Sequence, residues 1–437
     1  MRYAQRRLVI VVRADPVICG HSGEARNLAE VALTRGFDDV RLLTWPIATL
    51  QATGLPLKPL DRLQPYSPGI AVERPEPVGD YRVPDGRHLA GLTGRLVELL
   101  AEPVQTTCLA MYLVPHANIV IDAVNSARAA GFDPDVHTIA KAVGSDITNV
   151  VQNCLREGRF GAAAFLLTTF LAHDEVVAVS DYTRDEIVLA AEAVDLHSGT
   201  RFAPECRRRV TVSYPPIDTS AYVDVDLVAV DAALARRGLE RDGYILFLSR
   251  VTKAKGVHDL IEAYATSRAR ERVKLVIAGT GTALSEVRAL AAGDDRVVFL
   301  TDVDDDEKPL LMRGCATYAL PTKPESDFVE TFGIALAEKL LTGGGPVITT
   351  LTGGTGEAVG DTAVIVEAGD VAGLRAALDR VVLEMSDHDK RALEWRGREH
   401  ALAFDRVRVF DDLFAPTMHD ATVTPLRLSE ERAAGGS

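Results

Sequence analysis

The sequence predicts an α/β protein of two doubly wound domains, each with a parallel sheet covered by helices. Three observations lead to this class. The chain has 437 residues, more than one ordinary hydrophobic core accommodates. Short apolar runs rich in β-branched residues alternate with segments of helical periodicity, as they do in parallel α/β folds. The alternation is interrupted at Pro215-Pro216 and then starts again, which predicts a linker between two similar units.

The first unit begins with a strand over residues 8–12, a glycine loop and a helix that stops at Gly36. The glycines of this loop lack the spacing of a dinucleotide fingerprint, so no nicotinamide cofactor is predicted. Residues 56–87 are rich in proline, glycine and charge, and we predict an irregular insertion there. Two alternatives stay open for it: a lid or acceptor loop near the site, or an inert surface loop. The other strands of this unit are predicted at residues 40–43, 107–114, 135–140, 175–180 and 210–214.

The second unit repeats the pattern. Ligands of parallel sheets bind at the carboxyl ends of the strands, so the active site is expected between the two units. The predicted strands are residues 244–248, 274–278, 297–300, 316–320, 346–349 and 363–366.

Composition excludes several classes of partner. The formal net charge of −14 argues against a nucleic-acid partner and against attachment to an anionic membrane. No apolar run approaches the length of a spanning helix, so no stable membrane insertion is predicted. The five cysteines are scattered without a Cys-x-x-Cys pair, which favours reduced thiols in the cytoplasm over disulfides or a zinc site.

The stretch from Glu330 to Glu338 places two carboxylates eight residues apart, where a proline-containing loop becomes a helix. Gly333 is predicted in the first turn of that helix. Open N–H groups at a helix N-terminus bind anions, above all phosphate. The alternative is an ordinary amphipathic helix with charged ends.

Four motifs, in order along the chain, carry a resemblance to a known family. They are the loop Gly20–Glu24, Ser249-Arg250 with Lys255-Gly256, Gly279-Thr280-Gly281, and Glu330–Glu338. Together they resemble family 4 of the retaining glycosyltransferases. This family has the GT-B fold, with two Rossmann-like, doubly wound parallel-sheet domains facing each other across a cleft.

The resemblance implies the domain organisation. Residues 1–217 form an acceptor domain, which a C-terminal helix at about 402–418 completes. Residues 218–401 form the nucleotide-sugar donor domain, and 419–437 a flexible tail.

The resemblance also implies roles for particular residues. Fixed cations stabilise the charge that grows on a leaving diphosphate, which suits a guanidinium and an ammonium at this position. Gly144-Ser145-Asp146 departs from the family's usual segment, and which histidine lies at the donor sugar, His116 or His137, is left open. Predicted catalytic residues are Arg250, Lys255, Glu330 and His116. Predicted donor contacts are Gly23, Ser249, Gly279, Gly281, Thr331, Phe332, Gly333 and Glu338. Predicted acceptor or sugar contacts are His137, Lys141, Ser145 and Asp146, the alternative for Lys141 and Asp146 being exposed loop charges.

The implied reaction is retaining transfer by a front-face route, without a metal or another cofactor. Asp302–Asp306 contains an Asp-x-Asp but is interpreted as a solvated turn. The expected donor is GDP- or UDP-linked, and the acceptor is a soluble small molecule of natural-product or small-thiol metabolism. A narrower resemblance, in residues 13–27 and 141–149, is to S-glycosyltransferases of lincosamide biosynthesis, which join a GDP-activated octose to ergothioneine. A nucleotide-sugar epimerase of the same fold, a catalytically inactive nucleotide-binding homologue, and a homodimer are alternatives that stay open.

Overall fold

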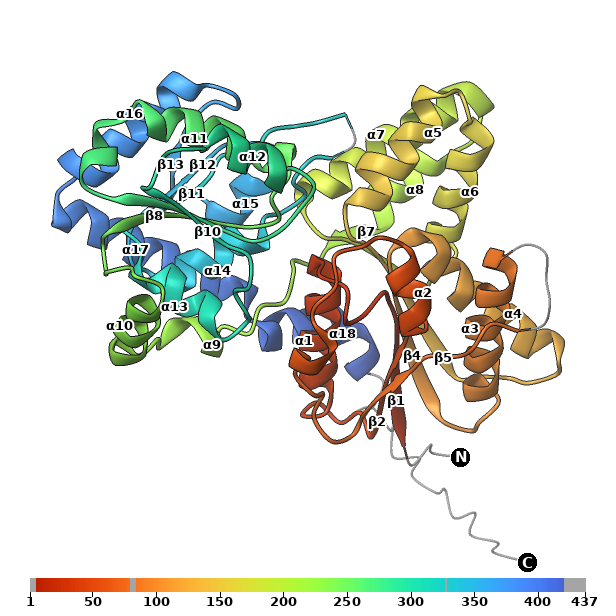
Figure 1. Cartoon of the computed structure of the whole chain (residues 1–437). Helices are drawn as coiled ribbons and strands as arrows, with labels where there is room; N and C mark the ends of the chain where they lie inside the picture. Colours follow the sequence, from red (N-terminus) through yellow and green to blue (C-terminus); the bar gives the residue numbers. More distant parts are fainter. Residues whose placement is uncertain (1–4, 79–83, 327, 420–437) are drawn as a thin grey trace, which may run out of the picture.

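The computed structural model describes residues 5–78, 84–326 and 328–419, which form two α/β domains, each with one parallel sheet (Figure 1). The predicted doubly wound class is confirmed. Residues 420–437 of the predicted tail lie outside the described part of the chain. None of the helices described is long and apolar enough to cross a membrane.

The first sheet has seven strands in the order β3-β2-β1-β4-β5-β6-β7. The inner strand β1 is apolar from Leu8 to Val11, as expected of a strand whose sheet is covered by helices on both faces. The strands are β1 (Arg6–Val11), β2 (Asp39–Leu43), β3 (Ile70–Glu73), β4 (Gln105–Met111), β5 (Val136–Ala142), β6 (Glu175–Ala178) and β7 (Val210–Val212). The helices are α1 (Gly20–Ala32), α2 (Ile47–Ala52), α3 (Pro84–Leu100), α4 (Asn118–Ala129), α5 (Gln152–Arg156), α6 (Phe160–Leu171), α7 (Asp181–Ser198) and α8 (Phe202–Arg209).

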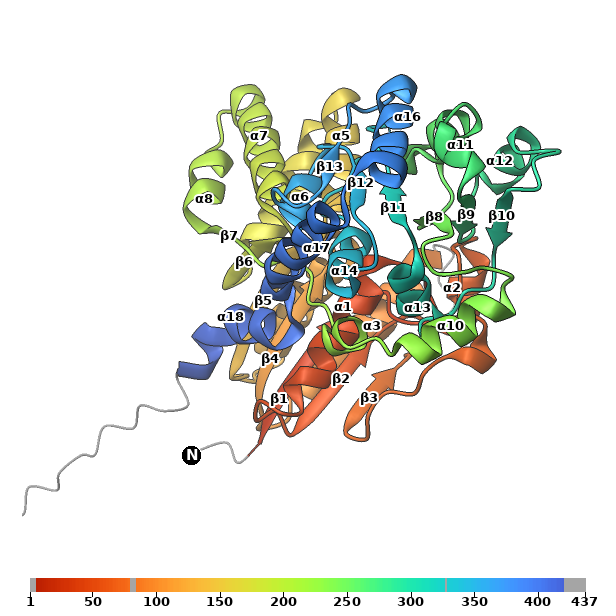
Figure 2. The ribbon, with the colours of Figure 1, turned by 90° about the vertical axis from the view of Figure 1, so that its left-hand side faces the viewer.

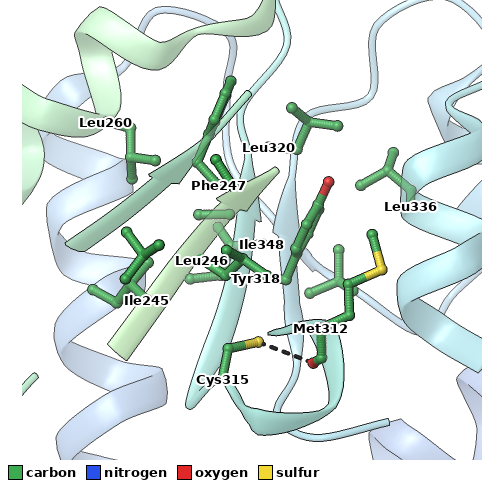
Figure 3. Packing of buried hydrophobic residues seen from close by; sticks show 14 of the residues in the cluster. Ile245, Leu246, Phe247, Leu260, Met312, Cys315, Tyr318, Leu320, Leu336 and Ile348 are labelled. Carbon is green, nitrogen blue, oxygen red and sulfur yellow. Dashed lines mark hydrogen bonds between the residues drawn. The ribbon is translucent and has the colours of Figure 1, made fainter. Parts of the chain in front are cut away.

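The second sheet has six strands in the order β10-β9-β8-β11-β12-β13. Its core packs Leu246 and Phe247 of β8 against Tyr318 of β11 and Leu336, and the Cys315 thiol donates to the Met312 carbonyl at 3.3 Å (Figure 3). The strands are β8 (Tyr244–Leu248), β9 (Lys274–Ala278), β10 (Val297–Leu300), β11 (Thr317–Leu320), β12 (Val347–Thr349) and β13 (Val364–Ile365). The helices are α9 (Ser220–Val223), α10 (Leu227–Arg236), α11 (Val257–Ala265), α12 (Leu284–Leu290), α13 (Glu307–Gly314), α14 (Ile334–Thr342), α15 (Thr355–Val359), α16 (Val371–Asp379) and α17 (Asp387–Ala401).

Both sheets have a point where the strand order reverses. It lies between β1 and β4 in the first sheet and between β8 and β11 in the second. Loops leave such neighbouring strands in opposite directions, so a crevice for ligands forms at their carboxyl ends. The segments that follow these four strands are therefore where the site is built.

The prediction of an irregular insertion at 56–87 is wrong in part. Residues Ile70–Glu73 form the edge strand β3, and helix α3 begins inside the predicted insertion, at Pro84. The strand has four half-buried residues, which is too short for an alternating pattern to be recognised. Proline is well tolerated at a helix start because the first N–H groups have no partner in the helix.

The chain crosses back to the first domain at its end. Helix α18 (Arg406–His419) packs beside α1, where Phe410 and Phe414 contact Phe37 (Figures 1 and 2). Arg35 of the first domain forms an ion pair with Asp411 at 2.6 Å. The two domains are thus joined both at the linker after β7 and at α18.

Candidate functional site

Arg250 follows β8 at the reversal point of the second sheet. Its loop is fixed by glycines of the loop after β9: a Cβ on Gly279, whose φ is +130°, would lie 2.1 Å from the Ser249 carbonyl oxygen, and a Cβ on Gly281 would lie 2.3 Å from that of Val251. These two predicted donor contacts therefore have a packing function, which is to let two backbones approach. Arg250 itself is exposed, with its guanidinium 5.5 Å from the Phe328 ring. No carboxylate in the described part of the chain pairs with it.

Lys255 and Glu330 form an ion pair in which both side chains are almost buried, with exposed fractions of 8% and 12%. Lys255 comes from the turn before α11, and Glu330 from the loop before α14. The pair uses Glu330 Oε2, so the two predicted catalytic charges are brought together and neutralise each other. The Phe328 ring lies 5.1 Å from the ammonium and covers this pair as well as Arg250.

The N-terminus of α14 is open. Gly333 is its N-cap, with φ +99°, whereas the sequence predicted it inside the first turn. The N–H groups of Thr331, Phe332 and Gly333 donate to no acceptor among the residues described. The Phe332 ring is buried against Tyr214 and Phe404, so only its backbone is available to a ligand.

The two domains touch at this helix end. Gly144, after β5, has φ +110°, and a Cβ there would lie 2.3 Å from Thr331 Oγ1. A Cβ on Gly20 would lie 3.1 Å from Ile334 Cδ1, so the start of α1 faces the start of α14. Gly23, in the first turn of α1, has nothing within 4 Å of its Cβ position. We call the region between the ends of these two helices the interdomain junction.

Glu338 lies further along α14. Its Oε1 accepts hydrogen bonds from Tyr222 Oη and Lys308 Nζ, both at 2.7 Å. Its Oε2 has no partner in the described part of the chain, and this atom is the one available to a ligand hydroxyl.

His116 lies at the reversal point of the first sheet, after β4. It is 4% exposed, its Nδ1 has no hydrogen-bond partner among the described residues, and its ring lies edge-on to Trp45 at 4.9 Å. Burial lowers the pKa of His116 to about 3, so the ring is neutral at physiological pH.

His21 and Arg13 lie beside His116, and the sequence analysis missed both. Arg13 Nη2 is 3.3 Å from His21 Nε2. Burial and, next, the Arg13 charge lower the pKa of His21 to about 3; the charges of His116 and Arg250 act in the same direction. Gly20, the neighbour of His21, faces Ile334 of the other domain, so His21 lies at the interdomain junction. The available signal was the position of Arg13 directly after a central strand.

The structure corrects the predicted acceptor contacts. His137 is the second residue of β5 and bonds Glu175 at 2.7 Å, at the edge of the sheet away from His116. Lys141 is fully buried and pairs with Glu24 at 2.9 Å, which excludes an exposed loop charge. Ser145, in the loop after β5, is half-buried.

Asp146 is also buried, and it too is no exposed loop charge. It accepts backbone hydrogen bonds from residues 113, 143, 144 and 147. Burial raises its pKa to about 6, while these hydrogen bonds oppose the rise. Its carboxylate therefore holds the loops after β4 and β5 together, which is a positioning task.

Asp305, within the Asp-x-Asp segment, is 53% exposed and pairs with Lys58 of the first domain at 2.7 Å. The residues described contain no group of three or more His, Cys, Asp or Glu placed to hold a metal ion. A hollow of about 490 Å³ exists elsewhere, lined by Asp242, Arg272 and Glu394 among others. It lies at the amino ends of the second sheet's strands, away from the residues above, and ligands of parallel sheets bind at the opposite edge.

The fold and part of the sequence resemble known glycosyltransferases. The family model described as "Glycosyl transferases group 1" matches residues 234–396. A glycogen synthase of Mycobacterium tuberculosis is 33% identical over 180 residues, covering 39% of this chain and 42% of that protein. The N-acetyl-alpha-D-glucosaminyl L-malate synthase of Bacillus anthracis is 25% identical over 260 residues, covering 56% of this chain and 65% of that protein.

Anabaena HepE, solved in complex with UDP and glucose, superposes with a TM-score of 0.65 at 18% identity, covering 95% of this chain and 100% of that one. The predicted GT-B fold is thereby confirmed. The family model and the relatives support a place among the group 1 glycosyltransferases. The chain spans about two fifths of the length of the glycogen synthase that it matches.

Proposed function

We propose that this protein is a retaining glycosyltransferase that moves a sugar from a nucleoside diphosphate sugar to a soluble small molecule. The observation that carries the proposal is the arrangement at the interdomain junction. There, the unpaired Arg250 and the Lys255–Glu330 pair lie at the second sheet's reversal point, and the N–H groups at the start of α14 are open. Two observations support this choice of substrate. The matched relatives are named as a glycogen synthase and an N-acetyl-alpha-D-glucosaminyl L-malate synthase, and the structural neighbour was solved in complex with UDP and glucose.

The chemistry that these groups suit is the departure of a diphosphate. The bond between the sugar C1 and the phosphate oxygen breaks, the acceptor atom bonds to C1 on the same face, and the acceptor proton passes to the departing phosphate. Negative charge grows on the diphosphate as the bond breaks. Arg250 and the α14 N–H groups stabilise that charge at fixed positions.

The glutamates have different tasks in this proposal. Glu338 accepts from the ribose hydroxyls through its unpartnered Oε2. Glu330 positions the Lys255 ammonium through Oε2 and keeps Oε1 for a sugar hydroxyl. Neutral His116 offers its buried Nδ1 near the sugar, and its low pKa favours a hydrogen-bonding role over a charged one.

The finer assignments belong to the same proposal. The donor is GDP- or UDP-linked, and catalysis needs neither a metal nor another cofactor. The acceptor is a small molecule of natural-product or thiol metabolism, ergothioneine among them, and the reaction takes place in the cytoplasm. One of the relatives is named as an N-acetyl-alpha-D-glucosaminyl L-malate synthase, and malate is a small molecule, which supports a small acceptor here.

Thermal-shift measurements with UDP, GDP, ADP and dTDP test the donor site. A nucleotide at about one hundred times its Kd stabilises the fold by about 2.7 kcal/mol, which raises Tm by roughly 5–10 °C for a domain of this size. Arg250→Ala should abolish the shift. Arg288→Ala is the matched control, because Arg288 is also exposed and lies 5.6 Å from the Phe299 ring. An absent shift in the wild type, or an unchanged shift in Arg250→Ala, contradicts the donor site.

Product analysis separates the transferase from the alternatives of the same fold. A transferase forms a new glycoside only when an acceptor is present. Mass spectrometry that finds an altered sugar nucleotide without acceptor would favour an epimerase instead.

A further inference from the structure

Arg13 is a cation without an anionic partner at the reversal point of the first sheet. It follows β1 and is half-buried, and its Nε is enclosed without a hydrogen-bond partner. The contacts that its guanidinium does make are neutral: His21 Nε2 at 3.3 Å and the thiol of Cys19. Asp15, two residues further along the chain, is engaged by Arg26 at 2.7 Å and by Lys58 at 3.7 Å. Within the described part of the chain, Arg13 therefore carries an uncompensated charge.

Arg250, from the other domain, is a second cation without a carboxylate partner among the described residues. The charges of both Arg13 and Arg250 act on His21 and on the Cys19 thiol, and the start of α1, which carries these two groups, meets the start of α14 at Gly20 and Ile334. Like charges that act on the same groups disfavour one another, unless anions bind between or beside them. The interdomain junction can therefore bind more negative charge than a single cation would neutralise.

The two cations have different surroundings. Arg250 stands with Lys255 and the open end of α14, all in the second domain. Arg13 stands among first-domain groups, and its charge also reaches His116 and Tyr112. The groups of the second domain are sufficient to bind the diphosphate, so Arg13 is available to bind another anion.

We propose that Arg13 binds an anionic group, carboxylate or phosphate, on the acceptor. This inference rests on the proposed function, and it names the class of acceptor: a small molecule with a negative charge beside the atom that receives the sugar. A guanidinium suits either anion, since its parallel N–H groups match two oxygens of one group.

Two further features fit an acceptor at this position. The hydroxyl of Ser22, in the first turn of α1, is enclosed and has no hydrogen-bond partner among the described residues. The half-buried side chains of Tyr112 and Trp45 flank His116, with ring centroids at 6.1 and 4.9 Å, and offer apolar surface to the body of the acceptor. A small organic anion is accommodated by this combination better than a bare ion is.

Calorimetric titration in two stages tests the assignment on the full chain. The first stage measures UDP and GDP affinity. The second titrates the nucleotide-saturated protein with malonate and, separately, with inorganic phosphate. We expect the wild type to bind one of the two probes, and the stronger of them identifies the anion. Arg13→Gln should weaken that binding at least tenfold and leave nucleotide affinity within about twofold, while Arg13→Lys retains part of it. Arg62→Gln, an exposed arginine of the same domain, is the control.

The outcomes are distinguishable. Equal probe binding by Arg13→Gln and the wild type overturns the inference, and so does a wild type that binds neither probe. A tenfold loss of nucleotide affinity with unchanged probe binding also overturns it, because Arg13 would then serve the donor diphosphate. A wild type that binds no nucleotide in the first stage is a failure of the proposed function itself, seen before any probe is added.

Discussion

The Lys255–Glu330 ion pair allows a quantitative test of how the donor site is held. Lys255→Met removes the ammonium and leaves the Glu330 carboxylate, which is 12% exposed, without its partner. Removing one member of a buried pair costs about 3–5 kcal/mol, because the remaining charge stays desolvated. Replacing both members, in Lys255→Met/Glu330→Gln, removes that charge and should recover most of the loss.

Urea unfolding followed by circular dichroism measures these free energies. Lys253→Met is the control, since Lys253 and its partner Glu286 are 61% and 53% exposed, and an exposed pair contributes less than about 1 kcal/mol. Both Lys255 variants should also lose the nucleotide-dependent thermal shift. If the single and double variants have the same free energy of unfolding, or if Lys255→Met costs no more than Lys253→Met, the burial argument is refuted.

Two further predictions concern His116 and Gly144. The pKa of His116 is about 3 in the folded protein and about 6.5 when unfolded, so the unfolded state binds the extra proton and stability falls as pH falls below about 6.5. His116→Gln lacks this loss. Between pH 6 and pH 4 its free energy of unfolding, measured in urea at several pH values, should rise relative to that of the wild type by about 1.4 kcal/mol for each unit by which the pH is lowered. A difference between the two proteins that does not change with pH contradicts the burial of a neutral ring. Gly144→Ala places a Cβ 2.3 Å from Thr331 Oγ1, so we expect it to lower the free energy of unfolding by about 1–3 kcal/mol and to weaken nucleotide binding. The control for both measurements is Gly131→Ala, whose Cβ position is open. Equal values for the two variants would exclude a tight contact between the domains at Gly144.

The fold was predictable because its signal is local. The apolar runs that became β1 and β8 are continuous and β-branched or aromatic, and each is followed by a helix-period segment. The short edge strand β3 carried no such pattern and was missed. The motif residues Arg250, Lys255 and Glu330 were singled out because they follow predicted strands of the second unit.

The site residues that were predicted wrongly or not predicted have a common cause. The position of a residue along a strand decides at which edge of the sheet its side chain lies. His137 lies near the amino end of the predicted strand 135–140. That position already excludes His137 from a site at the carboxyl ends of the strands. His21 lies in the motif Gly20–Glu24 and Arg13 just before it, but neither was assigned to the site. Only the pairing of β1 with β4 brings them beside His116.

The sequence by itself determined the class of fold and the two units, and it singled out the cationic and acidic residues proposed for the donor site, because periodicity and motif spacing act over short distances. The tertiary structure decided what those residues do to one another. Lys255 and Glu330 are 75 residues apart and neutralise each other, while Arg13 and Arg250 come from different domains and remain unpaired among the residues described. Charge compensation depends on distances between remote segments, and these exist only once the two sheets are folded and joined.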